Sequence, residues 1–126
     1  MKTTTEIGRY GEAAAVSYLK SKKYKILEQN YFASHNEIDI IAENKQYIIF
    51  VEVKSRSCVD PNAMLFGTPG EAVTYSKQKR TLQAAHTYLN EHKTKKTPRL
   101  DVIEVYLAKD SHEIIKINHI ENAFFA

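Results

Sequence analysis

Residues 37–54 read EIDIIAENKQYIIFVEVK, and this stretch decides the fold. Two runs rich in β-branched and aromatic residues, 37–42 and 47–54, are separated by the polar residues 43–46. Such a pattern predicts two antiparallel strands joined by a hairpin turn. The remaining helices and strands are expected to pack around this hairpin.

The pairing within the hairpin decides which side chains meet. If the turn is centred on residues 44–45, Asp39 lies opposite Phe50 and Glu37 lies opposite Glu52. Side chains alternate between the two faces of a strand, so the acids share one face. Asp39 and Glu52 then become diagonal neighbours, about 7–8 Å apart.

Three carboxylates and one ammonium group are therefore expected on one face: Glu37, Asp39, Glu52 and Lys54. Like charges placed so close repel one another, and burying them costs more. Lys54 is one source of compensation and a divalent cation is another. Carboxylate oxygens without Cys or His suit Mg²⁺ or Mn²⁺ better than Zn²⁺.

Four short motifs, taken in order, resemble one protein family: Gly8-x-x-Gly11-Glu12, Glu37-Ile-Asp39-Ile-Ile-Ala, Phe50-Val-Glu52-Val-Lys54-x-Arg56 and Arg99-x-Asp101-Val-Ile. From about Gly8 to Phe124 the chain resembles the YraN-like group of small bacterial proteins, which are described only as candidate endonucleases. That group is similar to archaeal Holliday-junction resolvases and to the PD-(D/E)xK nuclease superfamily. Two residues depart from the family pattern: Asn36 stands where Gly is usual, and Leu100 where Phe is usual.

The resemblance implies a restriction-endonuclease-like core and metal-dependent hydrolysis of phosphodiester bonds, with structured or branched DNA as the favoured substrate. Asp39 and Glu52 would hold one or two Mg²⁺ or Mn²⁺ ions. Glu12 would complete the metal shell, directly or through water. Lys54 would orient or deprotonate the attacking water, or stabilise the developing charge. Glu37 is ambiguous between a supporting role and a structural one.

Two other classes of protein remain open. A nucleic-acid-binding module could keep this scaffold without catalysis, although all four core site residues are present. An assembly protein could instead use the carboxylates as a salt-bridge network with Lys54 and Arg56. A titration with Mn²⁺ separates a metal site from a satisfied network of ion pairs.

The composition fits a soluble globular protein with one domain, residues 1–126. The chain is 43% apolar and 26% charged, which is ordinary for that class. One Cys excludes an internal disulfide. The N-terminus lacks the apolar run of a signal peptide, and no stretch approaches a membrane span. A cytoplasmic protein without a membrane partner is expected.

A helix is predicted to start near Thr5, because apolar residues recur at spacings of three and four through Tyr18. Gly8 and Gly11 are poor helix formers. Close packing of the helix on the sheet would explain them and would bring Glu12 near the strand carboxylates. From the residues alone, a solvated Glu on the helix surface is the alternative.

Positive charge is concentrated late in the chain, although the net charge is only +3. Between Tyr75 and Arg99 there are seven Lys or Arg and one acid, which favours a phosphate-binding footprint. A helix predicted from Ser76 to about His92 carries several of these cations at its start, the unfavourable end of the helix dipole. The predicted nucleic-acid-binding residues are Arg56, Lys77, Lys79, Arg80, Lys93, Lys95, Lys96 and Arg99; a solvated basic face is the alternative.

Further strands are predicted at 24–32, 100–108 and 113–119, so the order is α-β-β-β-α-β-β. A mixed β-sheet flanked by helices, an α/β fold, is the simplest closure. Residues 55–70 are predicted to form a long loop beside the site. The apolar tail 120–125 is expected to dock on the core or on a second copy of the chain, which leaves a homodimer open.

Overall fold

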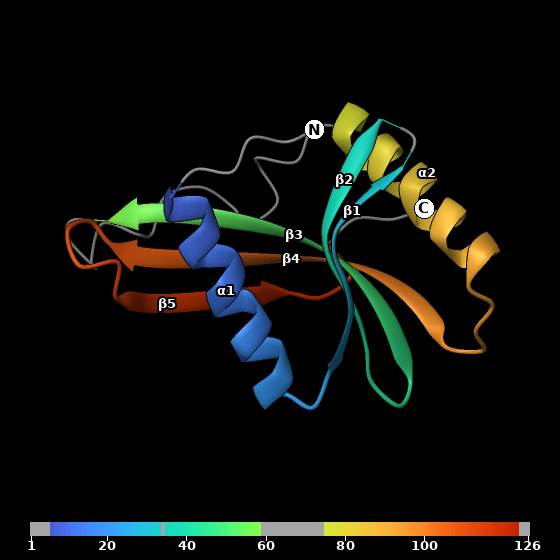
Figure 1. Ribbon diagram of the computed structural model, residues 1–126, viewed down its shortest axis with the longest axis horizontal. Coiled ribbons are helices and arrows are strands. Elements are labelled where there is room, and N and C mark those ends of the chain that lie inside the picture. The colour runs from blue at the N-terminus through green and yellow to red at the C-terminus, as the bar shows by residue number, and fades with distance from the viewer. Residues whose placement is uncertain (1–5, 34, 59–74, 124–126) are drawn as a thin grey trace.

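The computed structural model of the chain describes residues 6–33, 35–58 and 75–123. Its elements follow one another as α1 (Glu6–Ser21), β1 (Lys25–Ala33), β2 (Asn36–Glu43), β3 (Tyr47–Cys58), α2 (Tyr75–Glu91), β4 (Thr97–Ala108) and β5 (Ile114–Ile120). The strands form one sheet in which the spatial order equals the chain order. β3 and β4 are parallel, and the other neighbours are antiparallel. The predicted mixed sheet flanked by helices is confirmed (Figure 1).

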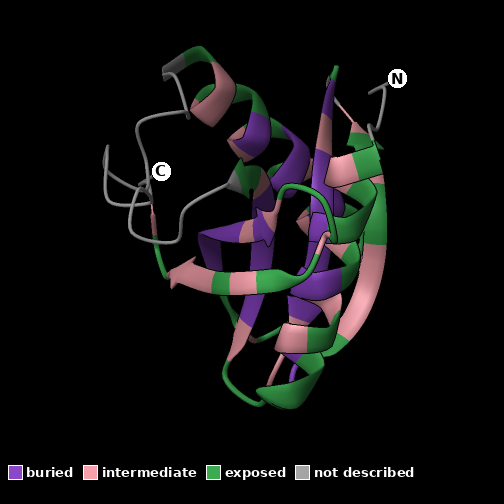
Figure 2. Ribbon diagram, turned by 90° about the vertical axis from the view of Figure 1, so that its left-hand side faces the viewer, coloured by how far each residue is buried: buried purple, intermediate pink, exposed green. Residues whose placement is uncertain are grey.

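The two helices cover opposite faces of the sheet. α1 packs across β3 and β4, whereas α2 packs against β1 and β2 (Figure 1). Alternate residues of β3 supply both cores: Val51 joins the α1-side cluster, and Phe50 joins the α2-side cluster. Figure 2 shows the buried residues gathered in the strands between the helices. Within the described ranges, no helix is long and apolar enough to cross a membrane.

Close contact between α1 and β3 explains one of the helix glycines. A Cβ atom added to Gly11 would overlap with Ser55 Oγ and would lie 2.8 Å from Ser55 Cβ. Gly11 is itself buried. The expectation that a glycine marks close packing of this helix on the sheet therefore holds for Gly11.

The hairpin pairing differs from the prediction by two residues. Phe50 lies opposite Ile41, and not opposite Asp39 as predicted. The cause is Asn44, whose Oδ1 accepts hydrogen bonds of 2.9 and 2.7 Å from the two N–H groups that follow Lys45. Asn44 therefore begins the turn instead of lying at its centre. A shift of two residues leaves the paired side chains on their predicted faces.

The strands β3 and β4 are longer than predicted. β3 continues to Cys58 and pairs with β4 along its whole length, so residues 55–58 are strand and not loop. β4 begins at Thr97, three residues before the predicted start. The rest of the predicted loop, the predicted helix start at Thr5 and the last residues of the tail lie outside the described residues.

Backbone distortions bend the first two strands. β1 contains a bulge at Leu27, and Asn30 has a left-handed φ of 56°. In the β1–β2 register Asn30 lies opposite Asp39. As a result Ile38 packs in the α2-side cluster and Ile40 in the α1-side cluster, although two residues of a regular strand would share a face.

Gly11→Ala should lower the free energy of unfolding by about 1–3 kcal/mol, because the new methyl group must displace Ser55. This loss should appear in urea unfolding in spite of the roughly 1 kcal/mol better helix propensity of Ala. In a Ser55→Gly background the overlap is relieved, so the same change should cost less. An equal loss in both backgrounds would rule out this packing as the cause.

Candidate functional site

The sheet forks where Asp39 and Glu52 lie. Pairing between β2 and β3 ends at Ile40 and Val51, whereas β2 stays paired with β1 as far as Asn36. β3 stays paired with β4 to its last residue. Figure 1 shows β1 and β2 leaving in one direction and β3 and β4 in another. Backbone groups at such a fork need partners other than a neighbouring strand.

Asp39 supplies one of these partners. Its side chain is fully buried, and its Oδ2 accepts a hydrogen bond of 2.8 Å from the N–H of Val53. A hydrogen bond to an ionised acceptor is stronger than one between neutral groups. The Asp39 carboxylate is thereby fixed against β3, at the residue that follows Glu52.

Glu52 lies between two ammonium groups that come from different elements. Its exposed fraction is 7%. Lys54 Nζ lies 3.5 Å from Glu52 Oε2, and Lys77 Nζ lies 3.6 Å from Glu52 Oε1. The sequence predicted Lys54 at the carboxylates but assigned Lys77 to a nucleic-acid-binding surface. The structure brings Lys77 to the same carboxylate.

Asn36 holds Lys77 in place, and the sequence analysis missed this role. Lys77 Nζ donates a hydrogen bond of 2.8 Å to Asn36 Oδ1. Asn36 Nδ2 donates in turn to Thr81 Oγ1 at 3.1 Å, and both of these residues are buried. Lys77 and Thr81 are four residues apart on α2, and this spacing was the available signal that they share a helix face. His35, just before Asn36, has a left-handed φ of 61°.

The other two acids, Glu12 and Glu37, lie on α1 and on β2. Glu12 is partly exposed on α1, and α1 packs on the face of β3 opposite to Glu52 and Lys54. Glu37 Oε1 is buried and has no hydrogen-bond partner among the described residues. In the part of the chain that the structure describes, no three His, Cys, Asp or Glu side chains converge on one point.

Asp39 and Glu52 are the residues that could hold a metal ion. Mg²⁺ is usually bound through one or two carboxylates and completes its shell with water and phosphate oxygens. Two buried carboxylates at the fork fit that requirement without a third acid. The buried Glu37 oxygen provides further acceptor capacity on β2.

The sheet face beyond Lys54 is polar. Glu104 lies beside Lys54 in the β3–β4 register and is 4% exposed. Its Oε1 accepts hydrogen bonds from Tyr106 at 3.1 Å and from Asn118 at 3.3 Å. Its Oε2 lies 3.9 Å from an Arg56 nitrogen. Arg56 is nearly half exposed, so it remains accessible to a ligand on this face.

The exposed cations of the basic segment lie at the two ends of α2. Lys79 and Arg80 are exposed in the first turns, near Lys77. Lys93 and Lys95 are exposed beyond the last turn. From Lys79 and Arg80 to its last residue, Glu91, the helix rises roughly 16–18 Å at 1.5 Å per residue.

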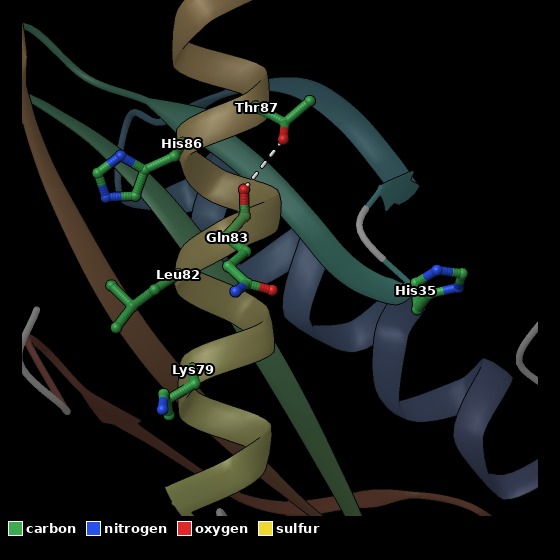
Figure 3. A pocket seen from close by; sticks show the side chains of 6 residues that line it. All are labelled: His35, Lys79, Leu82, Gln83, His86 and Thr87. Carbon is green, nitrogen blue, oxygen red and sulfur yellow. Dashed lines mark hydrogen bonds between the residues drawn. The ribbon is translucent and has the colours of Figure 1, made fainter.

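An open pocket of about 730 Å³ lies on the outer side of α2 and is lined by His35, Lys79, Leu82, Gln83, His86 and Thr87. Figure 3 shows Lys79, Leu82 and His86 on one side of the helix, with His35 on the turn across from them. None of the carboxylates at the fork lines this pocket, so it is separate from the fork.

Two of the predicted nucleic-acid-binding residues, Arg99 and Lys96, form ion pairs with acids of the same chain. Arg99 is 9% exposed, donates two hydrogen bonds of 2.9 Å to Asp101 and donates one of 2.8 Å to the Tyr24 hydroxyl. Lys96 Nζ lies 3.1 Å from Glu43 Oε1. Arg99 therefore serves a buried charged network.

Asp101 is the centre of that network. Its fully buried carboxylate also lies 2.7 Å from His119 Nε2 and accepts the N–H of Asn122 at 3.0 Å. Burial alone would raise the pKa of Asp101, but the hydrogen bonds with His119 and Arg99 outweigh burial and lower this pKa. Tyr18 joins the network from α1, because its hydroxyl lies 3.0 Å from His119 Nδ1.

Asp101→Asn should destabilise the fold at pH 7 by about 3–5 kcal/mol, because it leaves the buried Arg99 without a charged partner. The pKa of Asp101 is lowered from 3.8 on folding. The stabilisation is thus present above the unfolded-state pKa and is lost as the pH falls through the folded-state pKa. Urea unfolding at pH 7 and pH 3 should show the gap between wild type and variant narrowing at pH 3. A gap that does not change with pH would contradict this assignment.

Comparison with known proteins places the chain in a family. The model of the uncharacterised protein family UPF0102 matches residues 11–105. A UPF0102 protein of Clostridioides difficile is 48% identical over 94% of this chain and 96% of its own length. UPF0102 proteins of Alkaliphilus oremlandii and Caldanaerobacter subterraneus are 46% and 44% identical, over 94% of this chain and 97% and 93% of theirs. The chain therefore belongs to the UPF0102 family of uncharacterised proteins.

Proposed function

We propose that this chain is a metal-dependent endonuclease that hydrolyses phosphodiester bonds in nucleic acid. The observation that carries the proposal is that Asp39 and Glu52 are both buried at the fork of the sheet, where Asp39 binds the N–H of Val53, the residue after Glu52. Lys54 lies 3.5 Å from Glu52 on the same strand. This arrangement is the one expected from the resemblance to the PD-(D/E)xK superfamily and its restriction-endonuclease-like core. The preference for structured or branched DNA rests on that resemblance.

Asp39 and Glu52 would hold Mg²⁺ or Mn²⁺, because both offer carboxylate oxygens and neither Cys nor His lies with them. The resemblance implies that Glu12 would contribute as well, directly or through water. When bound, the metal supplies a Lewis acid and a water molecule of lowered pKa. The buried Glu37 oxygen without a described partner gives independent support for an acceptor-rich site.

Lys54 would act as a fixed positive charge. Its ammonium group is ion-paired with Glu52, and its side chain is 24% exposed, so a water molecule or a phosphate oxygen can reach it. A compact ammonium ion at this position can orient the attacking water and stabilise the charge that develops on the phosphate. We favour this role for Lys54 over that of a general base.

The nucleic acid would lie along α2 and the polar face of β3. Lys79 and Arg80 extend positive charge outward from the fork, and Arg56 extends it along β3. Lys93 and Lys95 would be reached only by a longer ligand, because the roughly 16–18 Å of helix before them already corresponds to about five base pairs.

A nucleic-acid-binding module without catalysis is the second candidate function. The observation in its favour is that Lys54 and Lys77 already neutralise Glu52. The same ion pairs, with Arg56 and Glu104, fit an assembly protein that uses the cluster as a salt-bridge network. Binding of Mn²⁺ that depends on Asp39 would separate the proposed enzyme from both.

Lys54→Ala should abolish cleavage while Mn²⁺ binding and nucleic-acid binding stay near wild type. Lys54→Arg should also fail, because a planar guanidinium does not replace a compact ammonium. The assay is single-turnover cleavage of branched, single-stranded and duplex DNA and RNA, with Mn²⁺ or with EDTA. We expect a loss of about a hundredfold or more for the removal of one such charged group.

Asp39→Ala is the matched control for that assay, since it should lose Mn²⁺ binding as well as cleavage. Full cleavage by Lys54→Ala would refute the role of Lys54. If wild type cleaves none of the substrates but still binds them, the binding module is the better description.

The exposed cations at the start of α2 should determine how strongly binding depends on salt. The double variant Lys79→Ala/Arg80→Ala should weaken DNA binding and reduce the slope of log K against log salt by about 2, because each lost phosphate contact removes roughly 0.9. Lys45→Ala/Lys109→Ala, in two exposed turns elsewhere, removes the same charge and should leave the slope nearly unchanged. Equal slopes for the two double variants would move the footprint away from α2.

A further inference from the structure

We propose that Lys77 is a positioning residue of the same site: Asn36 holds its ammonium group on Glu52, where it competes with the metal ion. The inference rests on the proposed metal-dependent function and deepens it by naming what sets the affinity for metal. In this arrangement the ammonium group occupies the carboxylate in the absence of metal, and the metal ion must displace it.

The first support is that Lys77 spans the fork. Its ammonium group contacts Asn36 on β2 at 2.8 Å and Glu52 on β3 at 3.6 Å, while its backbone belongs to α2. Beyond Ile40 the two strands do not pair with each other. Lys77 thus joins two strands at the position where their hydrogen-bond ladder has ended.

The second support is that a buried amide, that of Asn36, fixes the position of the Lys77 ammonium group. A Lys ammonium can only donate, so the Asn36 amide must turn its oxygen to Lys77 and its nitrogen to Thr81. Asn36 and Thr81 are each 4% exposed. A buried amide held at both ends has one orientation, and it directs Lys77 towards Glu52.

The third support is that the two lysines at Glu52 differ. Lys54 contacts Oε2 and arises from the same strand as Glu52, whereas Lys77 contacts Oε1 and is anchored on Asn36. A positive charge held at Oε1 repels a divalent cation that approaches the same oxygen. Removing the Lys77 charge should therefore tighten metal binding, whereas removing a positive charge far from Glu52 should have little effect.

The test is calorimetric titration with Mn²⁺ of wild type, Lys77→Gln, Lys77→Arg and Lys93→Gln. Lys77→Gln should bind Mn²⁺ about threefold to tenfold more tightly than wild type, as Coulomb repulsion at this range in high dielectric implies. Lys93→Gln removes the same charge at the far end of α2 and should stay within about twofold. Lys77→Arg keeps the charge and should return the affinity towards wild type.

A double-mutant cycle in urea, without metal, tests the positioning independently. Glu52→Gln and Lys77→Gln should shift the unfolding midpoint non-additively, because the two residues form one ion pair. Additive shifts would overturn the inference even if the protein binds metal.

The two measurements separate the inference from the proposed function. If wild type and Lys77→Gln bind Mn²⁺ equally, the inference fails while the metal site stands. If the cycle shows coupling but no variant binds Mn²⁺, the pair is a structural ion pair, and both the inference and the proposed metal function fall.

Discussion

The hydrogen bond from the Val53 N–H to the Asp39 carboxylate is the contact on which the centre of the molecule depends. A mixed sheet that divides between two of its inner strands must satisfy backbone groups that would otherwise pair across the gap. Asp39 does this with a side chain, and the acid is buried because the backbone group is buried. Its carboxylate is therefore part of the architecture as well as part of the candidate site, and its removal would affect both.

Charge balance at the fork follows from that constraint. Once Asp39 and Glu52 are both buried at the fork, positive charge has to lie close to them. Lys54 comes from the strand itself, and Lys77 comes from the helix that covers the other half of the sheet. The Asn36 amide joins this helix to β2. The packing of α2 therefore also determines where the Lys77 charge lies relative to Glu52.

The period-two pattern of residues 37–54 was sufficient to predict the hairpin and the shared face of Glu52 and Lys54, and the patterns of the other segments predicted the element order, because these depend on local chemistry. The predicted register was wrong by two residues, because the turn was assumed to be centred on residues 44–45. In the structure the Asn44 side chain accepts two backbone hydrogen bonds and begins the turn. Arg99 was predicted to belong to a basic surface, because burial is not visible in composition. In the structure Arg99 is buried and donates to Asp101, which lies two residues further along the chain. The approach of Lys77 to the fork depends on tertiary packing, so spacing along the chain could not show it.

β1 forms one outer edge of the sheet, and an edge strand exposes N–H and C=O groups that another chain can pair with. The bulge at Leu27 and the left-handed backbone at Asn30 divide β1 into short runs that bend away from a flat edge. Phe32 is 57% exposed on this strand and would favour self-association on a straight edge. The distortion that lies opposite Asp39 therefore also makes β1 a poor template for aggregation.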